Sequence, residues 1–215
     1  NGGWTLYTTI FGLVMMTLGV GAIGSKLGLK KAMQVGSWGV VIFNTIIILL
    51  FLFLDPKTLN LPGYVNGYGE PFTHLSLFTV GLLLFSIVAE GAQMICTSAV
   101  PPMIADINDY EASQSGKYIT GMVATIYTFI DKFISAMAPM LVGLAFAWIG
   151  FKDTLPDVDT PCTAALFTFG LVFYYGVCVL GAICNVIAMR YYELTPEKMN
   201  EVRENLSKLR VGSGN

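Results

Sequence analysis

Two charged residues, Asp131 and Lys132, stand side by side within an apolar stretch that runs from residue 127 to residue 144. If this stretch crosses a membrane, a charge at the bilayer centre costs about 3 kcal/mol even on the most lenient insertion scale. Ionisable residues inside membrane segments usually face a cavity or another helix, and they mark the pathways of solutes and ions. The pair is therefore the first candidate site.

A second candidate group precedes it. Glu90, Gln93 and Thr97 are spaced by three and four residues, which places them on one face of a helix. At 1.5 Å per residue, Glu90 and Lys132 both lie about 22 Å along their expected helices, so the two side chains could meet near the bilayer midplane. The two carboxylates of Glu90 and Asp131 and the single ammonium group of Lys132 would leave one net negative charge. A proton, Na⁺ or another basic residue must balance this charge. The alternative is that the charges form only a structural salt bridge.

The composition predicts an all-α, polytopic membrane protein. Hydrophobic residues make up 54% of the 215 residues and charged residues 12%, with a mean hydropathy of +0.66. Globular chains carry roughly 25% charged residues. The runs 1–25, 32–54, 133–151 and 160–189 contain no Asp, Glu, Lys or Arg. About 20 apolar residues suffice for a helix to cross a bilayer.

These runs predict a bundle of five transmembrane helices within residues 1–192, followed by a tail, residues 193–215. In the tail, Thr195 can cap a helix whose first position is Pro196. An amphipathic helix at the membrane surface or against the bundle is expected, because its apolar residues share one face. The expected spans are about 4–24, 33–54, 75–104, 118–150 and 164–189, and the apolar tail residues are Met199, Val202, Leu206 and Leu209.

The distribution of cations predicts the orientation. The first and third loops and the tail hold nine lysines and arginines, whereas the other two loops hold two. Cytoplasmic loops carry the excess of Lys and Arg. We therefore expect a multi-pass protein of the cell membrane (inner or plasma membrane) with its C-terminus in the cytoplasm.

Several functional classes lack support. No basic, aromatic-rich segment indicates a nucleic-acid partner, and the four cysteines form no CxxC motif that would indicate a metal or disulfide framework. We expect neither an enzyme nor a bound cofactor. The lipid bilayer is the partner that the composition implies.

The loop after the first expected span carries a motif, "GAIGSKLGLKK". It resembles the Gly-x-x-x-Asp-Arg/Lys-x-Gly-x-Arg/Lys loop of the major facilitator superfamily. Gly21, Lys26, Gly28 and Lys30 match this pattern, and Ser25 stands where the acid usually is.

A longer segment, residues 103–137, resembles the glycoside–pentoside–hexuronide:cation symporters, of which melibiose permease is the familiar member. That family has an Ala-Asp-x-x-Asp-Tyr-Glu/Gly loop followed by a helix with a mid-membrane lysine. The matching residues here are Ala105, Asp106, Asp109, Tyr110, Glu111 and Lys132.

The resemblance implies twelve helices in two bundles, alternating access, and a sugar that moves with Na⁺, Li⁺ or H⁺. The chain would correspond to the last five helices, so we expect an N-terminal half that contributes the remaining ones. It also implies that Lys132 faces cation-binding carboxylates of that half, and that Tyr127 and Thr128 face the sugar. Thr97 falls near a family aromatic, and the acids at Glu90 and Asp131 depart from the melibiose-type pattern.

The cytoplasmic motifs suggest a gate. Asp106, Asp109 and Glu111 could pair with Lys26, Lys30 and Lys31 when the carrier faces outward, or they could be solvated loop charges. Gly21 and Gly28 belong to the same predicted gate through the loop motif.

The leading hypothesis is cation-coupled symport of a sugar, glycoside or hexuronide. The alternatives are a carrier of the same fold for lipids or another solute, and a membrane subunit that transports nothing.

Overall fold

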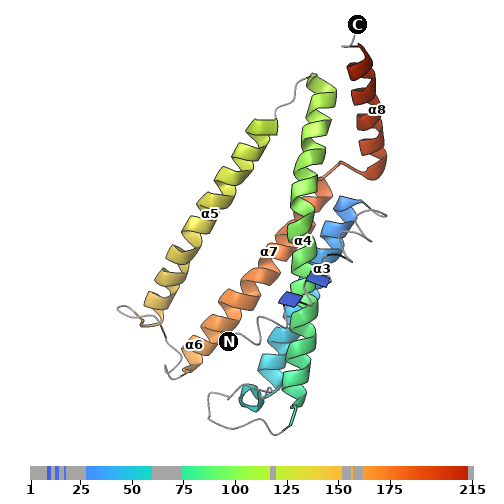
Figure 1. Ribbon diagram of the computed structural model, residues 1–215. Coiled ribbons are helices and arrows are strands. Elements are labelled where there is room, and N and C mark those ends of the chain that lie inside the picture. Colours follow the sequence, from blue (N-terminus) through green and yellow to red (C-terminus); the bar gives the residue numbers. More distant parts are fainter. Residues whose placement is uncertain are drawn as a thin grey trace.

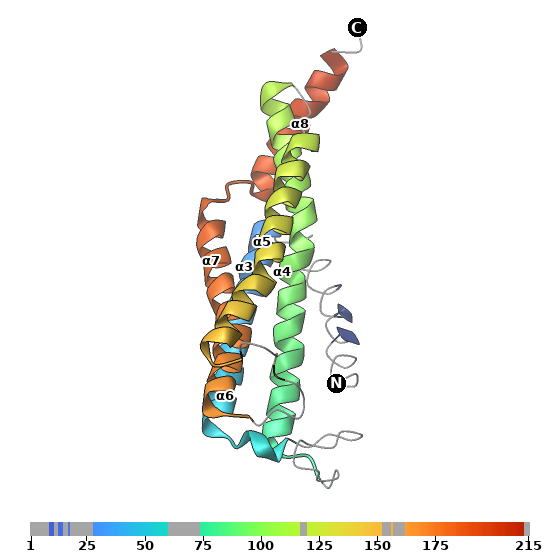
Figure 2. The same ribbon diagram turned by 90° about the vertical axis from the view of Figure 1, so that its left-hand side faces the viewer.

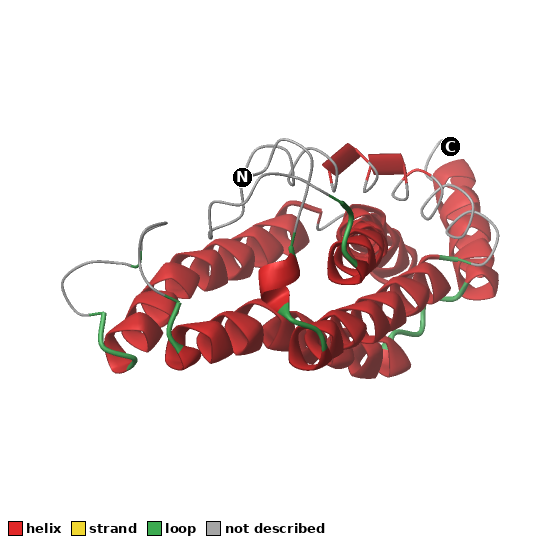
Figure 3. Cartoon of the chain, turned by 90° about the horizontal axis from the view of Figure 1, so that it is seen from below, coloured by secondary structure: helices red, strands yellow, loops and turns green. Residues whose placement is uncertain are grey.

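The described part of the chain consists of helices and the loops that join them. The computed structural model describes residues 9–10, 13–14, 17, 28–59, 74–116, 120–151, 156 and 162–212, the side chains of 120 and 209–212 excepted. In these residues helices are joined by loops and there is no strand (Figures 1 and 3). The prediction of an all-α protein is confirmed.

Within the described residues, four stretches of helix are long and apolar enough to cross a membrane. They correspond to the last four predicted spans, whereas the predicted span at about 4–24 lies almost wholly outside the described residues. The elements are α3 (Leu29–Phe53), α4 (Leu77–Ser115), α5 (Thr120–Trp148), and the run of α6 (Ala164–Gly170), η3 (Leu171–Gly176) and α7 (Val177–Tyr191), with the short η2 (Pro56–Thr58) after α3 and α8 (Pro196–Gly212) in the tail.

Helix α3 packs against both α4 and α7. Small residues allow α3 and α4 to approach closely, as is common between membrane helices. A Cβ atom at Gly36 would lie 2.8 Å from the Cys96 sulfur, and one at Gly39 would lie 2.9 Å from the Ala92 Cβ. The absence of side chains at these glycines therefore sets the distance between the two helices.

Aromatic and aliphatic side chains close the other end of this helix group. The ring of Phe51 lies 5.3 Å from that of Phe78 on α4 and 5.9 Å from that of Tyr175 on η3, measured between centroids. Ile47 and Leu82 are buried beside them. This cluster ties α3, α4 and η3 together.

Helix α4 is longer than predicted. The expected span ended near residue 104, with residues 105–117 as a loop, but α4 continues through Pro101 and Pro102 to Ser115. Each proline removes a backbone hydrogen bond and its ring crowds the preceding turn, but the segment beyond the prolines packs against α8, which favours the continued helix. Gly116, with φ 69°, then ends the helix in the left-handed conformation that glycine favours. At 1.5 Å per residue, its 39 residues span about 58 Å, well beyond the roughly 30 Å hydrocarbon core.

Helix α5 stands apart from the other helices (Figure 1). It has few contacts with α4, and none of the residues in its most apolar window is buried. At its far end, the ring of Phe146 lies 4.4 Å from that of Phe169 in α6. The described part of the chain therefore leaves the faces of α5 largely uncovered.

Helix α8 lies beside the extension of α4 in both side views (Figures 1 and 2). The hydroxyl oxygen of Thr195 accepts a hydrogen bond from the Lys198 N–H at 3.3 Å and caps the helix. Met199 and Val202, which belong to the predicted apolar face, are buried. The position of α8 in the cytoplasm stays a prediction.

Candidate functional site

A cavity of about 290 Å³ lies between α3, α4 and the η3–α7 segment, and Thr9 near the N-terminus also lines it. Its wall includes Glu90, which lies about 20 Å from the start of α4 at 1.5 Å per residue. Asn44 of α3 is only 8% exposed and lines the same cavity. The polar lining residues of the helices are Asn44, Ser86, Glu90, Gln93, Tyr174 and Tyr175.

Most of these polar groups have no hydrogen-bond partner in the described part of the chain. The Asn44 amide nitrogen donates to the Val40 carbonyl at 2.9 Å, but its side-chain oxygen accepts nothing. The hydroxyl of Ser86 and the carboxylate of Glu90 likewise make no hydrogen bond or ion pair with described residues. Ser86 and Glu90 are only half-buried, so their polar groups are open to the cavity and can form hydrogen bonds with a ligand there.

A π-helical segment forms one wall of this cavity. In η3, the Val177 N–H bonds to the Val172 carbonyl, one residue further back than in an α-helix. Tyr174 and Tyr175 project from this segment, and their rings lie 4.9 Å apart, edge to face. Single π turns inside helices occur frequently at functional sites.

The predicted pair of Asp131 and Lys132 lies on α5, away from the cavity. The Lys132 Nζ is 3.9 Å from an Asp131 carboxylate oxygen, and their side chains are 78% and 49% exposed. In the described residues no ion pair joins Glu90 to Lys132, because α5 makes few contacts with α4. Their predicted pairing is not formed in this structure.

The remaining residues of the predicted substrate and cation pathway lie either near the cavity on α4 or on α5. Gln93 lines the cavity together with Glu90. Thr97 is exposed one turn further along, where its hydroxyl donates to the Gln93 carbonyl at 3.1 Å. Tyr127 and Thr128 are exposed on α5, one turn before Lys132. The structure therefore groups Glu90 with Gln93, and Tyr127 and Thr128 with Lys132.

At the end of the molecule that is predicted to be cytoplasmic, the start of α3 contacts the connection between α7 and α8. The Lys30 Nζ donates to the Tyr192 carbonyl at 2.6 Å. A Cβ atom at Gly28, whose φ is 85°, would lie 2.6 Å from the Pro196 ring, so only glycine fits there. Gly21 and Lys26 of the predicted gate lie outside the described residues.

The acids of the predicted gate lie on the helical extension of α4, beside α8. Asp109 shares a surface cavity of about 420 Å³ with Arg203 of α8. In the described residues no ion pair joins Asp106, Asp109 or Glu111 to Lys30. The gate therefore stays a prediction that needs another conformation.

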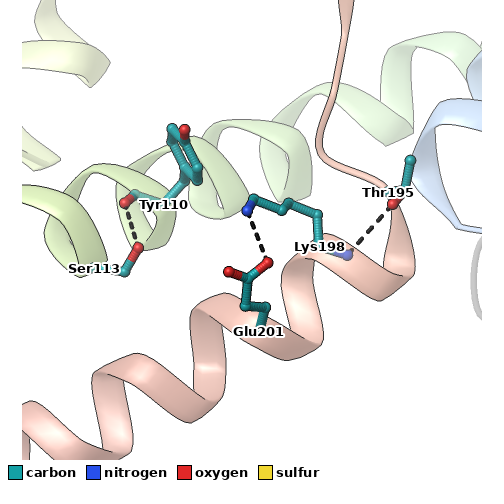
Figure 4. Close-up of polar contacts among 5 residues, drawn as sticks. All are labelled: Tyr110, Ser113, Thr195, Lys198 and Glu201. Atoms are coloured by element: carbon teal, nitrogen blue, oxygen red, sulfur yellow. Dashed lines mark hydrogen bonds and ion pairs between the residues drawn. The ribbon is translucent and has the colours of Figure 1, made fainter.

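Tyr110 of α4 and Lys198 of α8 lie at the α4–α8 contact and line one surface cavity (Figure 4). The Lys198 Nζ forms a 2.7 Å ion pair with Glu201, and this contact raises the pKa of Lys198. Next to them, burial and the charge of Asp106 raise the pKa of the Tyr192 hydroxyl to about 12. Tyr192 is therefore a neutral hydroxyl group at physiological pH.

Sequence reasoning missed part of the cavity. Asn44 is one of two amides, with Gln34, in an uncharged 23-residue run, residues 32–54. Polar residues inside membrane segments are rare enough to be candidate site residues, as charged ones are. Tyr174 and Tyr175 follow Phe173 in an aromatic run, which is a weak signal. No periodicity in the sequence indicates the π turn or the approach of Ser86 to these residues.

Comparison with known proteins gives one match. A family model described as MFS/sugar transport protein matches residues 1–195. No curated protein matches the chain, and no solved structure does. Within the described residues, no group of three or more His, Cys, Asp or Glu side chains could hold a metal ion.

Proposed function

Because the chain belongs to the MFS/sugar transport protein family, we propose that it forms the C-terminal helices of a carrier that moves a sugar or glycoside together with a cation. The family match and the apolar helices identify a membrane transporter. The polar cavity beside Glu90 is the observation that supports this proposal, because it places unpaired oxygen and amide groups between apolar helices.

The mechanism is conformational. A ligand shifts the balance between inward-open and outward-open states only as far as its affinities for the two states differ. In many carriers the binding sites lie near the bilayer midplane, at the interface between two repeats. An N-terminal bundle opposite α5 would cover Tyr127, Thr128 and Lys132, and the solute would bind between the two bundles.

The polar residues have distinct proposed roles. Tyr127 and Thr128 contact the sugar from α5, and Gln93 and Thr97 contact it from α4. Lys132 balances carboxylates of the opposite bundle when the cation has left. Asp106, Asp109 and Glu111 act at the cytoplasmic gate together with Lys26 and Lys30.

Uptake by the full-length carrier tests the proposal. The carrier is reconstituted in liposomes and supplied with radiolabelled hexoses, pentoses, glycosides and hexuronides, with and without inward gradients of Na⁺ or H⁺. The proposal predicts that one of these sugars accumulates above its external concentration only when a gradient is imposed. Transfer of a labelled lipid in place of every sugar would contradict it, as would the absence of any transport.

A further inference from the structure

A cavity of about 290 Å³ lies where α7 ends and α8 begins, against the extension of α4. Three tyrosines, a glutamate and a lysine line it together with two apolar residues: Tyr110, Tyr191, Tyr192, Glu193 and Lys198, with Ile107 and Leu194. Its described lining contains none of the residues of the proposed sugar and cation pathway. The proposed function therefore gives this cavity no role.

The cavity lies at the depth of the lipid headgroups. The span of α6, η3 and α7 has 28 residues and ends at Tyr191, so at 1.5 Å per residue it is about 42 Å long. Ile107 lies about 45 Å along α4, which begins at Leu77. A bilayer is roughly 30 Å thick in its hydrocarbon core and 40–45 Å thick with its headgroups. Two helices therefore reach the cavity at the level where the headgroups of one leaflet begin.

An apolar face of α7 leads to this cavity. Leu180, Ile183, Ile187 and Tyr191 recur at three and four residues, which places them on one side of the helix. All four are exposed in the described part of the chain. Acyl chains can cover such a face, and tyrosines are common at its end, where hydrocarbon meets headgroups. A lipid therefore fits both the cavity and the face below it.

Tyrosine rings and a carboxylate are suited to bind an ammonium group. The faces of aromatic rings attract cations, and tyrosines often hold ammonium ligands in this way. The side chain of Tyr191 is 82% exposed, so its ring is open to a ligand. The carboxylate of Glu193 is also exposed and forms no ion pair with the described residues.

Lys198 and Tyr110 are suited to bind a phosphate group beside the ammonium. The Lys198 Nζ donates one hydrogen bond to Glu201 at 2.7 Å, and a lysine ammonium has three donors. Tyr110 lies beside Lys198 (Figure 4), and its hydroxyl makes no hydrogen bond within the described residues. Lysine commonly binds phosphate through its charge.

The hydroxyl of Tyr192 is an independent indication of a binding site. Its oxygen is buried without a hydrogen-bond partner, as is only the side-chain oxygen of Asn108 elsewhere in the described part of the chain. An unpaired buried hydroxyl costs about 1–3 kcal/mol. Tyr192 belongs to the non-helical connection, residues 192–195, between α7 and α8. A small shift of this connection would bring the hydroxyl to a ligand in the cavity.

We propose that the cavity at the α7–α8 junction binds the headgroup of a zwitterionic phospholipid. Its ammonium group lies against Glu193 and the tyrosine rings, and its phosphate group lies against Lys198 and Tyr110. One acidic and one basic side chain match the two charges of this headgroup, whereas a purely anionic headgroup would leave Glu193 without a partner. The lipid site is separate from the proposed sugar and cation pathway, so the two are tested independently.

Native mass spectrometry of the delipidated full-length carrier, titrated in detergent with phosphatidylethanolamine, measures this binding. Phosphatidylglycerol with the same acyl chains and soluble phosphoethanolamine are the comparison ligands. We expect one phosphatidylethanolamine to bind more tightly than the others. Its affinity should fall about tenfold in Glu193→Gln and about fivefold in Tyr192→Phe, as expected for the loss of one hydrogen-bonding group.

Two control variants and a stability measurement separate lipid binding from a structural role. Glu204→Gln removes an exposed carboxylate of α8 that pairs with Lys208, and Tyr174→Phe removes the hydroxyl of an exposed tyrosine in η3. Both should bind phosphatidylethanolamine as the unmodified carrier does. Tyr192→Phe removes a hydroxyl without a partner, so the melting temperature of the lipid-free carrier should stay equal or rise.

Each outcome decides the proposal. Equal affinity of the unmodified carrier and Glu193→Gln for phosphatidylethanolamine would overturn the site, and so would equally tight binding of phosphatidylglycerol. Soluble phosphoethanolamine that binds as tightly as the lipid would assign the cavity to a soluble ligand and overturn the lipid. Selective loss of the tight lipid in Glu193→Gln would support the site even in a carrier that accumulates no sugar.

Discussion

Glu90 and Lys132 lie in different surroundings although both belong to apolar segments. Glu90 faces a cavity between three helices, where Asn44 and Ser86 offer oxygen atoms. Lys132 lies on the exposed α5 and contacts Asp131 at 3.9 Å. An exposed pair at this distance contributes little energy in water, so its importance depends on what covers α5 in the membrane.

The separation of the two residues leads to a prediction about their coupling. Glu90→Gln and Lys132→Met should change the free energy of unfolding independently, because no described ion pair joins them. Substitutions without shared contacts add within about 0.5 kcal/mol. Unfolding of the full-length carrier in mixed detergent micelles, titrated with sodium dodecyl sulfate, measures both single variants and the double variant.

A larger coupling energy between Glu90 and Lys132 would contradict this prediction. The free energy of unfolding of the double variant could exceed the value expected from the two single variants. An excess of about 1 kcal/mol or more is twice the usual limit of additivity. It would mean that α5 approaches α4 in the folded carrier. The originally predicted pair of Glu90 and Lys132 would then be restored.

At the scale of helices, close packing holds α3 against α4. Gly36→Ala would place a Cβ atom 2.8 Å from the Cys96 sulfur and 3.0 Å from the Ala92 carbonyl oxygen. Overpacking of this kind costs typically 1–3 kcal/mol, so the melting temperature should fall. The change is measured in a background in which the exposed Cys162, Cys178 and Cys184 are replaced by serine, so that a thiol-reactive fluorescent dye reports the exposure of Cys96 on heating.

Gly181→Ala on α7 is the matched control. A Cβ atom at Gly181 would meet no heavy atom within 4 Å, and alanine favours a helix over glycine by about 1 kcal/mol. Its melting temperature should stay equal or rise. Equal melting temperatures for the two variants would show that α3 and α4 are not in close contact at Gly36.

The tail helix α8 gives a second prediction at this scale. Val202 is buried where α8 meets the described helices, so Val202→Asp would place a charge in an apolar contact and should release α8. Limited proteolysis of the tail, followed by mass spectrometry, should then become several times faster. The control, Asn200→Asp, changes an exposed position on the same helix and should leave the rate of proteolysis unchanged. A similar rate for both variants would mean that the apolar face does not hold α8 in place.

Over the whole molecule, the sequence predicted the membrane helices more securely than the site. The uncharged runs marked α3, α5 and the α6–α7 segment because crossing a bilayer requires a long apolar helix. The extension of α4 was missed, because Pro101 and Pro102 resemble a helix end although the contact with α8 continues the helix. The cavity depends on which faces of α3, α4 and η3 meet, and the spacing of residues within one helix does not contain that information.

The predicted site residues show the same limit, because spacing within a helix does not tell which helices meet. Periodicity placed Glu90 and Gln93 on one face of α4, and both line the cavity. It also gave Glu90 and Lys132 similar depths, but equal depth does not bring two helices into contact. Depth is therefore a guide to which residues could meet, and the packing of α5 decides whether they do.

We propose that Lys132 couples the movement of the solute to that of a cation. Gradient-driven sugar accumulation by the reconstituted full-length carrier and its Lys132→Ala variant tests this coupling, with Lys208→Ala of the exposed tail as control. We predict that Lys132→Ala inserts normally but accumulates no sugar above its external concentration, whereas Lys208→Ala accumulates it normally. Normal accumulation by the Lys132→Ala carrier would contradict the account.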